Sequence, residues 1–94
     1  MASNVSYFVK SAGITLSDGS VFGAETREAF RVVKETGIHG FKVFEMIGTQ
    51  MVNVFGNGKY VEWQEMKNAI NERITYQISI GNKVFRGSEE ITEV

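Results

Sequence analysis

Glycine is the residue that most constrains this fold, because ten glycines must form the turns of a chain that has no proline. Proline averages about 5% of residues in soluble domains. Glycine takes the backbone conformations of tight turns without steric cost. The sequence therefore predicts short elements joined by glycine-containing turns. At 94 residues we expect one domain, residues 1–94.

Residues 4–10 and 14–22 have the patterns of β-strands. The first segment carries Phe8 on one face and three apolar residues on the other: Val5, Tyr7 and Val9. Such alternation is typical of a half-buried strand. The second segment contains the turn Ser17-Asp18-Gly19-Ser20, and an Asp-Gly pair tolerates the positive φ of a tight hairpin.

Residues 40–56 are expected to form two strands around Gly48-Thr49-Gln50. Apolar residues fall on both faces of this segment, which is typical of a central strand or of one covered on both sides. A helix on each side of the sheet, or the interface of a dimer, would supply the second cover.

Two segments have helical spacing. Residues 24–37 place Ala29, Phe30 and Val33 on one side and end at Gly37, a natural helix stop. A second helix is expected over about residues 62–73, where apolar positions recur every three or four residues from Trp63 through Met66 and Ile70 to Ile74. We expect both helices to pack on the sheet through these side chains.

The C-terminal third is expected to contain one more hairpin. Tyr76, Ile78 and Ile80 alternate before Gly81-Asn82, and Val84-Phe85 return the chain. Ser88 is suited to cap a short terminal helix, the alternative being a frayed end.

These patterns predict the α+β class: a small, mainly antiparallel, hairpin-rich sheet of five to seven short strands, packed by two amphipathic helices. One interpretation of the repeated order of strand, glycine turn, strand and helix is a ββα unit used more than once along the chain.

The residues that could perform catalysis are few. The chain has one histidine, His39, one aspartate, Asp18, and no cysteine. A phosphate-binding loop needs Gly-Lys-Ser/Thr preceded by a glycine five positions earlier. In Gly56-Asn57-Gly58-Lys59 both ends of that motif fail, so we interpret this loop as a hairpin tip. We expect no catalytic residue, no cofactor and no metal site.

Charged residues indicate one candidate interaction surface. The net charge is −1, whereas nucleic-acid binders usually carry a basic excess. Arg27, Arg31 and Lys34 form a basic stripe on the first predicted helix, and further lysines stand beside phenylalanines in the strands. The candidate surface comprises Arg27, Arg31, Lys34, Lys42, Phe44 and Lys83.

The leading functional hypothesis is a non-enzymatic, intracellular module that binds a protein partner, as a monomer or a homodimer. Small size favours an accessory protein of a phage or mobile element that binds and modulates a host protein. One alternative is a nucleic-acid-binding module that uses the basic stripe and the Lys/Phe strands. Another is an enzyme or small-ligand domain that uses His39.

We expect a cytoplasmic protein that does not enter a membrane. The absence of cysteine suits a reducing compartment. The first ten residues lack the basic and apolar regions of a signal peptide, and no apolar run approaches the ~20 residues of a membrane span.

Overall fold

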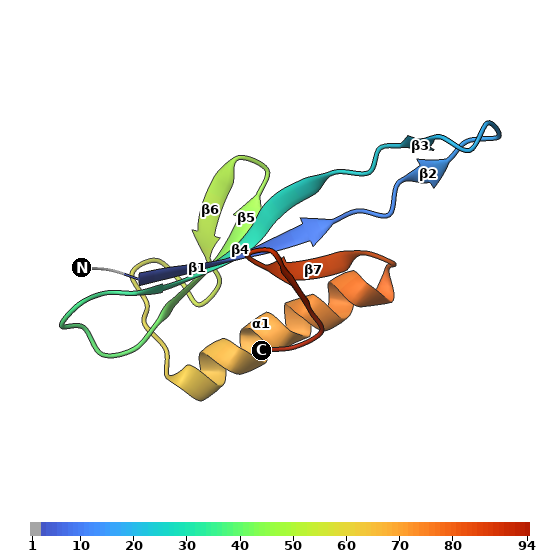
Figure 1. The fold of residues 1–94 in the computed structure, drawn as a ribbon. Helices are drawn as coiled ribbons and strands as arrows, with labels where there is room; N and C mark the ends of the chain where they lie inside the picture. Colours follow the sequence, from blue (N-terminus) through green and yellow to red (C-terminus); the bar gives the residue numbers. More distant parts are fainter. Residues whose placement is uncertain (1–2) are drawn as a thin grey trace.

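The computed structural model describes residues 3–94, which form a six-stranded antiparallel sheet with one helix on one face and a two-stranded arm that projects from one end (Figure 1). The order of the sheet is β6-β5-β4-β1-β7-β8. Its strands are β1 (Ser3–Lys10), β4 (Thr26–Lys34), β5 (Lys42–Ile47), β6 (Gln50–Asn53), β7 (Lys83–Arg86) and β8 (Glu89–Ile91). The arm pairs β2 (Ile14–Thr15) with β3 (Val21–Phe22), and the helix is α1 (Trp63–Ser79).

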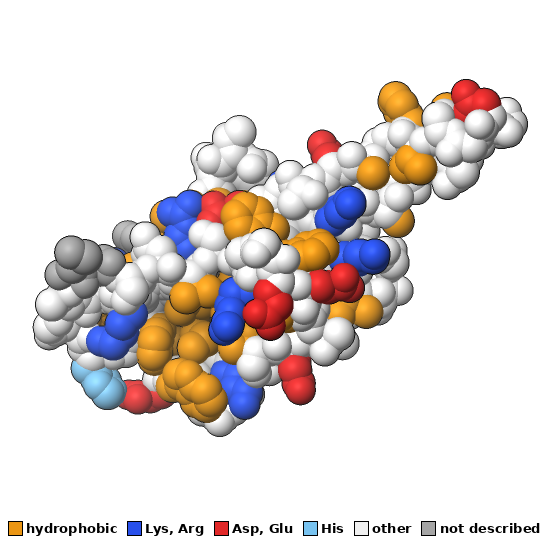
Figure 2. All heavy atoms as spheres, viewed as in Figure 1, with side chains coloured by type: hydrophobic (Ala, Val, Ile, Leu, Met, Phe, Trp, Pro, Cys, Tyr) orange, Lys and Arg blue, Asp and Glu red, His pale blue; other side chains and the backbone are white. Residues whose placement is uncertain are grey.

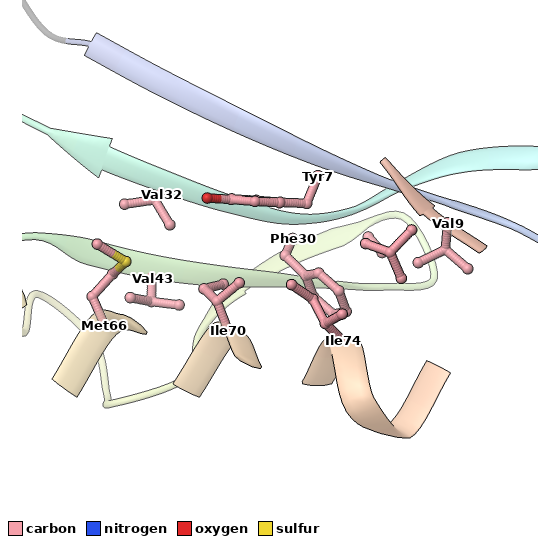
Figure 3. Packing of buried hydrophobic residues seen from close by; sticks show 10 residues of the cluster. Tyr7, Val9, Phe30, Val32, Val43, Met66, Ile70 and Ile74 are labelled. Atoms are coloured by element: carbon pink, nitrogen blue, oxygen red, sulfur yellow. The ribbon is translucent and has the colours of Figure 1, made fainter. Parts of the chain in front are cut away.

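The core lies between α1 and one face of the sheet. Three strands contribute the buried side chains Tyr7, Val9, Phe30, Val32 and Val43 to this core (Figure 3). Val84 of β7 belongs to the same buried cluster. The helix contributes Met66, Ile70 and Ile74, spaced four residues apart so that they fall on one face. Fully burying an aliphatic or aromatic side chain stabilises the fold by about 1.5–3 kcal/mol, and these residues therefore hold the helix on the sheet.

The helix begins with a reciprocal capping arrangement. The Glu62 carboxylate accepts from the backbone of Glu65, and the Glu65 carboxylate accepts from the Glu62 N–H at 3.1 Å. Two of the N–H groups that every helix start leaves unpaired are thereby satisfied. The prediction of a helix over residues 62–73 is confirmed, although the helix continues to Ser79. The described residues contain no helix long and apolar enough to cross a bilayer.

The helix expected over residues 24–37 is wrong: most of this segment is β4, which pairs with β1 on one side and β5 on the other. The register shifts between Tyr7 and Phe8, so that Tyr7 faces Phe30 and Phe8 faces Glu28, which leaves Ala29 as an extra residue. This β-bulge puts two neighbouring buried residues in the strand, Ala29 and Phe30. The alternation is broken there, and the spacing imitates a helix.

The predictions for the C-terminal third are also corrected. Tyr76 and Ile78, expected in a strand, belong to the last turns of α1. Gly81 (φ 91°) follows the helix, and β7 pairs with β1 rather than with residues 76–80. Residues 89–91, where a capped helix or a frayed end was expected, form β8 and pair with β7. With one helix in the described residues, neither a second helix nor repeated ββα units are confirmed.

The loop after β6 turns the chain at two glycines. Gly56 (φ 118°) and Gly58 (φ 74°) both have positive φ, and the chain then returns so that Val61 and Phe41 exchange two backbone hydrogen bonds of 2.8 Å. The glycines therefore reverse the chain as expected, although an isolated bridge takes the place of a second strand. This loop carries the chain from the sheet edge to the start of α1.

Candidate interaction surfaces

The sheet face opposite α1 is the first candidate surface. Strand register places on this face the residues that pair with Phe8, Arg31 and Met46, which are Glu28, Phe85, Ser6, Phe44 and Met51. We call it the open face. Its apolar residues, all half-buried or exposed, are Phe8, Val33, Phe44, Met46, Met51 and Phe85. Its charged residues are Lys10, Glu28, Arg31, Lys42, Lys83 and Glu90.

Four of the six residues predicted as an interaction surface lie on the open face: Arg31, Lys42 and Phe44 on neighbouring strands, and Lys83 on β7. The other two, Arg27 and Lys34, lie on the opposite face. They pair across the strands with Val9 and Ser3, which are on the side of the sheet that α1 covers. The predicted basic stripe of Arg27, Arg31 and Lys34 is therefore wrong. On a strand, residues four positions apart share a face and residues three apart do not.

Two of the cations on the open face already have acidic partners. Arg31 donates to the Glu28 carboxylate from Nη2 at 2.7 Å and from Nε at 3.1 Å. This pairing lowers the pKa of Glu28 and raises the pKa of Arg31. Lys42 Nζ lies 3.7 Å from the Glu35 carboxylate and 4.9 Å from the centre of the Tyr60 ring. Tyr60 also donates a hydrogen bond to Glu35, which is the main cause of the lowered pKa of that carboxyl.

The other two cations, Lys10 and Lys83, stand directly opposite each other on neighbouring strands. Both are exposed, and neither forms an ion pair within residues 3–94. Like charges facing each other across a strand pair are destabilising, so a carboxylate brought between them would be attracted. Lys10 also borders a hollow of about 360 Å³ whose walls include Phe8 and Phe85.

Sequence reasoning did not assign Phe8 and Phe85 to the candidate surface. The available signal was the alternation in residues 4–10, which placed Phe8 opposite Tyr7 and Val9. The pairing of Phe8 with Phe85 across β1 and β7 depends on β7 joining β1, and no local pattern indicates that long-range pairing.

The projecting arm, residues 11–25, is the second candidate surface (Figures 1 and 2). Four large apolar side chains on it are exposed: Ile14 (65%), Leu16 (46%), Val21 (57%) and Phe22 (70%). Ile14 pairs with Phe22 and therefore shares a face of the ribbon with it and with Leu16. The arm carries the carboxylates of Asp18 and Glu25 but no lysine or arginine.

Local hydrogen bonds give the arm its shape. At the tip, Asp18 accepts from the hydroxyl and the backbone N–H of Ser20 at 2.5 and 2.9 Å, which lowers the pKa of Asp18. At the base, the Ser11 hydroxyl bonds to the backbone of Gly23 and Glu25. The predicted turn at Ser17-Asp18-Gly19-Ser20 is confirmed, with Gly19 at φ 88°.

His39, the candidate base, lies in the loop before β5. Its Nε2 is 2.9 Å from a Glu62 carboxylate oxygen, and the two side chains are 85% and 67% exposed. This contact joins the loop to the residue that caps the start of α1. Among residues 3–94, no group of three His, Cys, Asp or Glu side chains could hold a metal ion.

A hollow of about 280 Å³ lies between α1 and strands β4 and β5. Its polar residues include Glu45 and Arg73, whose carboxylate and Nε are 3.5 Å apart. Arg73 Nε is buried and makes no hydrogen bond, while its Nη1 donates to the Ala69 carbonyl at 3.1 Å. This pair links the helix to the sheet.

Comparison of the chain with protein-family models, with curated proteins and with solved structures gave no match. The arm and the open face are therefore the features from which function is inferred.

Proposed function

We propose that this protein is a non-enzymatic module that binds other proteins through its projecting arm. The observation that carries this proposal is the exposure of Ile14, Leu16, Val21 and Phe22 on a ribbon that extends away from the core. Large apolar side chains gathered on a projection are typical of a surface that becomes buried on association.

The arm contributes little to the stability of the protein that carries it. An isolated two-stranded hairpin is at best marginally stable in water, and β2 and β3 form a separate two-stranded sheet. None of its four large apolar side chains belongs to the buried core. Burial against a partner would remove this apolar surface from water, at about 25 cal/mol for each Å².

The experiment is affinity capture from cells that naturally make the protein. A variant with Ile14→Ser and Phe22→Ser is compared with the wild type and with Ile47→Ser. Ile47 is a suitable control because it is 60% exposed and is the last residue of β5, outside the arm. The arm variant is expected to lose its protein partner while Ile47→Ser retains it. Equal recovery of the same partner by all three proteins would contradict the proposal.

An intracellular setting, and an accessory role in which the protein modulates a host factor for a phage or mobile element, belong to the same proposal. Small size and the absence of cysteine support them. Phage or mobile-element genes beside the coding sequence are expected, and a neighbourhood of metabolic genes would favour a ligand-binding domain instead.

Single-stranded nucleic acid is the second candidate ligand, favoured by the pairing of Phe8 with Phe85 beside Lys10 and Lys83. Bases stack on aromatic rings next to cations, at about 1–3 kcal/mol for each base. This candidate ranks second because Arg31 and Lys42 already have carboxylate partners. It predicts binding of a labelled oligonucleotide that weakens about tenfold in Phe85→Ala and falls steeply with salt. Unchanged fluorescence anisotropy at low salt would exclude it.

A further inference from the structure

The arm presents exposed apolar side chains, and the open face has a hollow with aromatic walls. Phe22 is 70% exposed, and the hollow beside Lys10 is walled by Phe8 and Phe85. An aromatic side chain placed there would pack against two rings, and aromatic pairs attract each other beyond the effect of the buried area.

The charges of the two surfaces are complementary as well. The arm carries only carboxylates, Asp18 and Glu25. The open face carries more cations than carboxylates, and its Lys10–Lys83 pair has no acidic partner within the described residues. An acidic ribbon laid over this pair would relieve the repulsion between the two ammonium groups.

The arm does not reach the hollow of its own chain. Lys10 and Thr26 line the hollow, and the arm begins and ends directly beside these residues and then extends outward (Figure 1). In a second copy placed antiparallel to the first, the arm points toward the hollow of the first copy. Each arm then runs past the base of the other arm and reaches the hollow of the other copy.

The accessible surface of the chain is larger than that of a compact monomer, by about the area that a dimer contact would bury. The radius of gyration is 15.0 Å, against about 12 Å for a compact domain of this length. The accessible surface is 6268 Å², against about 5,400 Å² for a compact monomer of this mass. The excess, roughly 800 Å² for each copy, is similar to the area that one partner buries in a standard interface.

We propose that two copies of this chain associate by reciprocal exchange of their arms, with Phe22 of each copy in the Phe8–Phe85 hollow of the other. The carboxylates of each arm lie over Lys10 and Lys83 of the facing copy. This inference rests on the proposed function of the arm as a docking element and names its partner as a second copy.

Because the chain has no cysteine, introduced thiols test the contact directly. Chains carrying Phe22→Cys are mixed with chains carrying Phe85→Cys under mild oxidation and are expected to form a mixed disulfide dimer. The matched control pairs Phe22→Cys with Gln64→Cys, an exposed position on α1, and is expected to give little product. Equal yields from the two mixtures, or no product in either, would overturn the proposal.

Sedimentation of the purified wild-type chain, free of nucleic acid, gives an independent measurement. The mass is expected to rise with concentration from 10.5 kDa toward twice that value, and to remain that of a monomer in Phe22→Ser and in the Lys10→Glu, Lys83→Glu variant. Circular dichroism should be unchanged in both variants, because neither alters the core. Thermal unfolding should be unchanged at protein concentrations at which the wild type is monomeric, since association itself stabilises the folded chain. A wild type that stays monomeric overturns the inference, as does a dimer that survives Phe22→Ser.

The two proposals fail in different ways. A monomeric wild type whose arm variant still loses its partner in affinity capture would contradict arm exchange and leave the proposed function intact. A monomer that binds an oligonucleotide through Phe8 and Phe85 would show that nucleic acid, and not a second copy, covers the open face.

Discussion

Arg31 and Glu28 form the best-defined polar pair on the open face. Their side chains are 32% and 22% exposed, and Arg31 donates two hydrogen bonds to one carboxylate. Partly exposed ion pairs stabilise a fold by about 1 kcal/mol or less. The pair also reduces the net positive charge that the open face presents to a ligand.

The lowered pKa of Glu28 predicts an acid-dependent loss of stability. The ordinary value is 4.5, and because the folded-state pKa lies below it, this contribution is present above about pH 4.5 and is lost as the pH falls through the lowered pKa. Denaturant unfolding between neutral pH and about pH 3 should show a smaller acid-dependent decrease for Glu28→Gln than for the wild type. Parallel curves for the two proteins would contradict this origin.

Two glycines of the arm allow a matched comparison. Gly13 (φ 73°) and Gly19 (φ 88°) both have a backbone conformation that costs alanine about 1–2 kcal/mol. A Cβ at Gly13 would also lie 2.9 Å from the backbone nitrogen and Cβ of Ala24, whereas a Cβ at Gly19 would meet nothing within 4 Å. Gly13→Ala should therefore disorder the arm more than Gly19→Ala does.

Amide hydrogen exchange at Leu16, whose N–H donates to the Ser20 carbonyl at 2.7 Å, measures this difference. Exchange at Leu16 should be fastest in Gly13→Ala, while amides in β1 and β4 keep their protection. Equal exchange in the two variants would show that the contact with Ala24 has no influence on the arm.

At the scale of elements, β4 determines how the sheet is built. It pairs on both sides and carries Phe30 and Val32 into the core. The bulge at Ala29 increases the local twist of a strand pair, and it moves Glu28 to the open face opposite Phe8. Both the core and the open face therefore depend on this irregularity.

Substitutions in α1 test which of its apolar side chains belong to the core. Ile70 has no exposed surface, whereas Trp63, expected in the same apolar stripe, is 51% exposed and lies beside Lys67. Ile70→Ala should cost about 2–5 kcal/mol of unfolding free energy, and Trp63→Ala about 1 kcal/mol or less. Urea unfolding of both variants measures this order, and a larger loss for Trp63→Ala would contradict the assigned core.

Local patterns predicted several elements. Alternation predicted β1, an apolar segment divided by a glycine turn predicted β5 and β6, and spacing of three or four residues predicted α1. The same reasoning failed at β4 because one extra residue placed Ala29 beside Phe30, and it failed after Ile74 because alternation at Tyr76 and Ile78 competes with a helix that had already begun. The available hint for β4 was the β-branched pair Val32-Val33, which favours a strand.

The candidate surface could be predicted only in part. Residue type alone grouped Arg31, Lys42, Phe44 and Lys83, and it is strand pairing that places them on one face. The exposure of the arm was not predictable, because alternation of Ile14 and Leu16 is the same whether a strand lies on a core or projects into solvent.

At the scale of the whole molecule, the chain is elongated, with extents of 55 × 23 × 22 Å. Its helix covers one face of the sheet, and its arm extends from one end (Figure 1). Apolar side chains remain on two separate surfaces, the arm and the open face. A molecule of this shape is suited to contact a partner at two places at once.

A partner that contacts both the arm and the open face would bury a large interface. If the arm and the open face are both covered on association, amides of Leu16 in the arm and of Phe44 in β5 should gain protection from hydrogen exchange together as the protein concentration rises. The amide of Gln64, in the first turn of α1, should not change. Protection confined to α1 would contradict the assignment of both surfaces.

The most direct test of the central claim, that the arm is the docking element, is photo-crosslinking in cells that naturally make the protein. A benzophenone side chain replaces Phe22 in one variant and Ile47 in the other, since both positions are exposed. The account predicts discrete protein adducts from position 22, including a second copy of this chain, and few from position 47. No adduct from position 22, or the same adducts in equal yield from both positions, would contradict it.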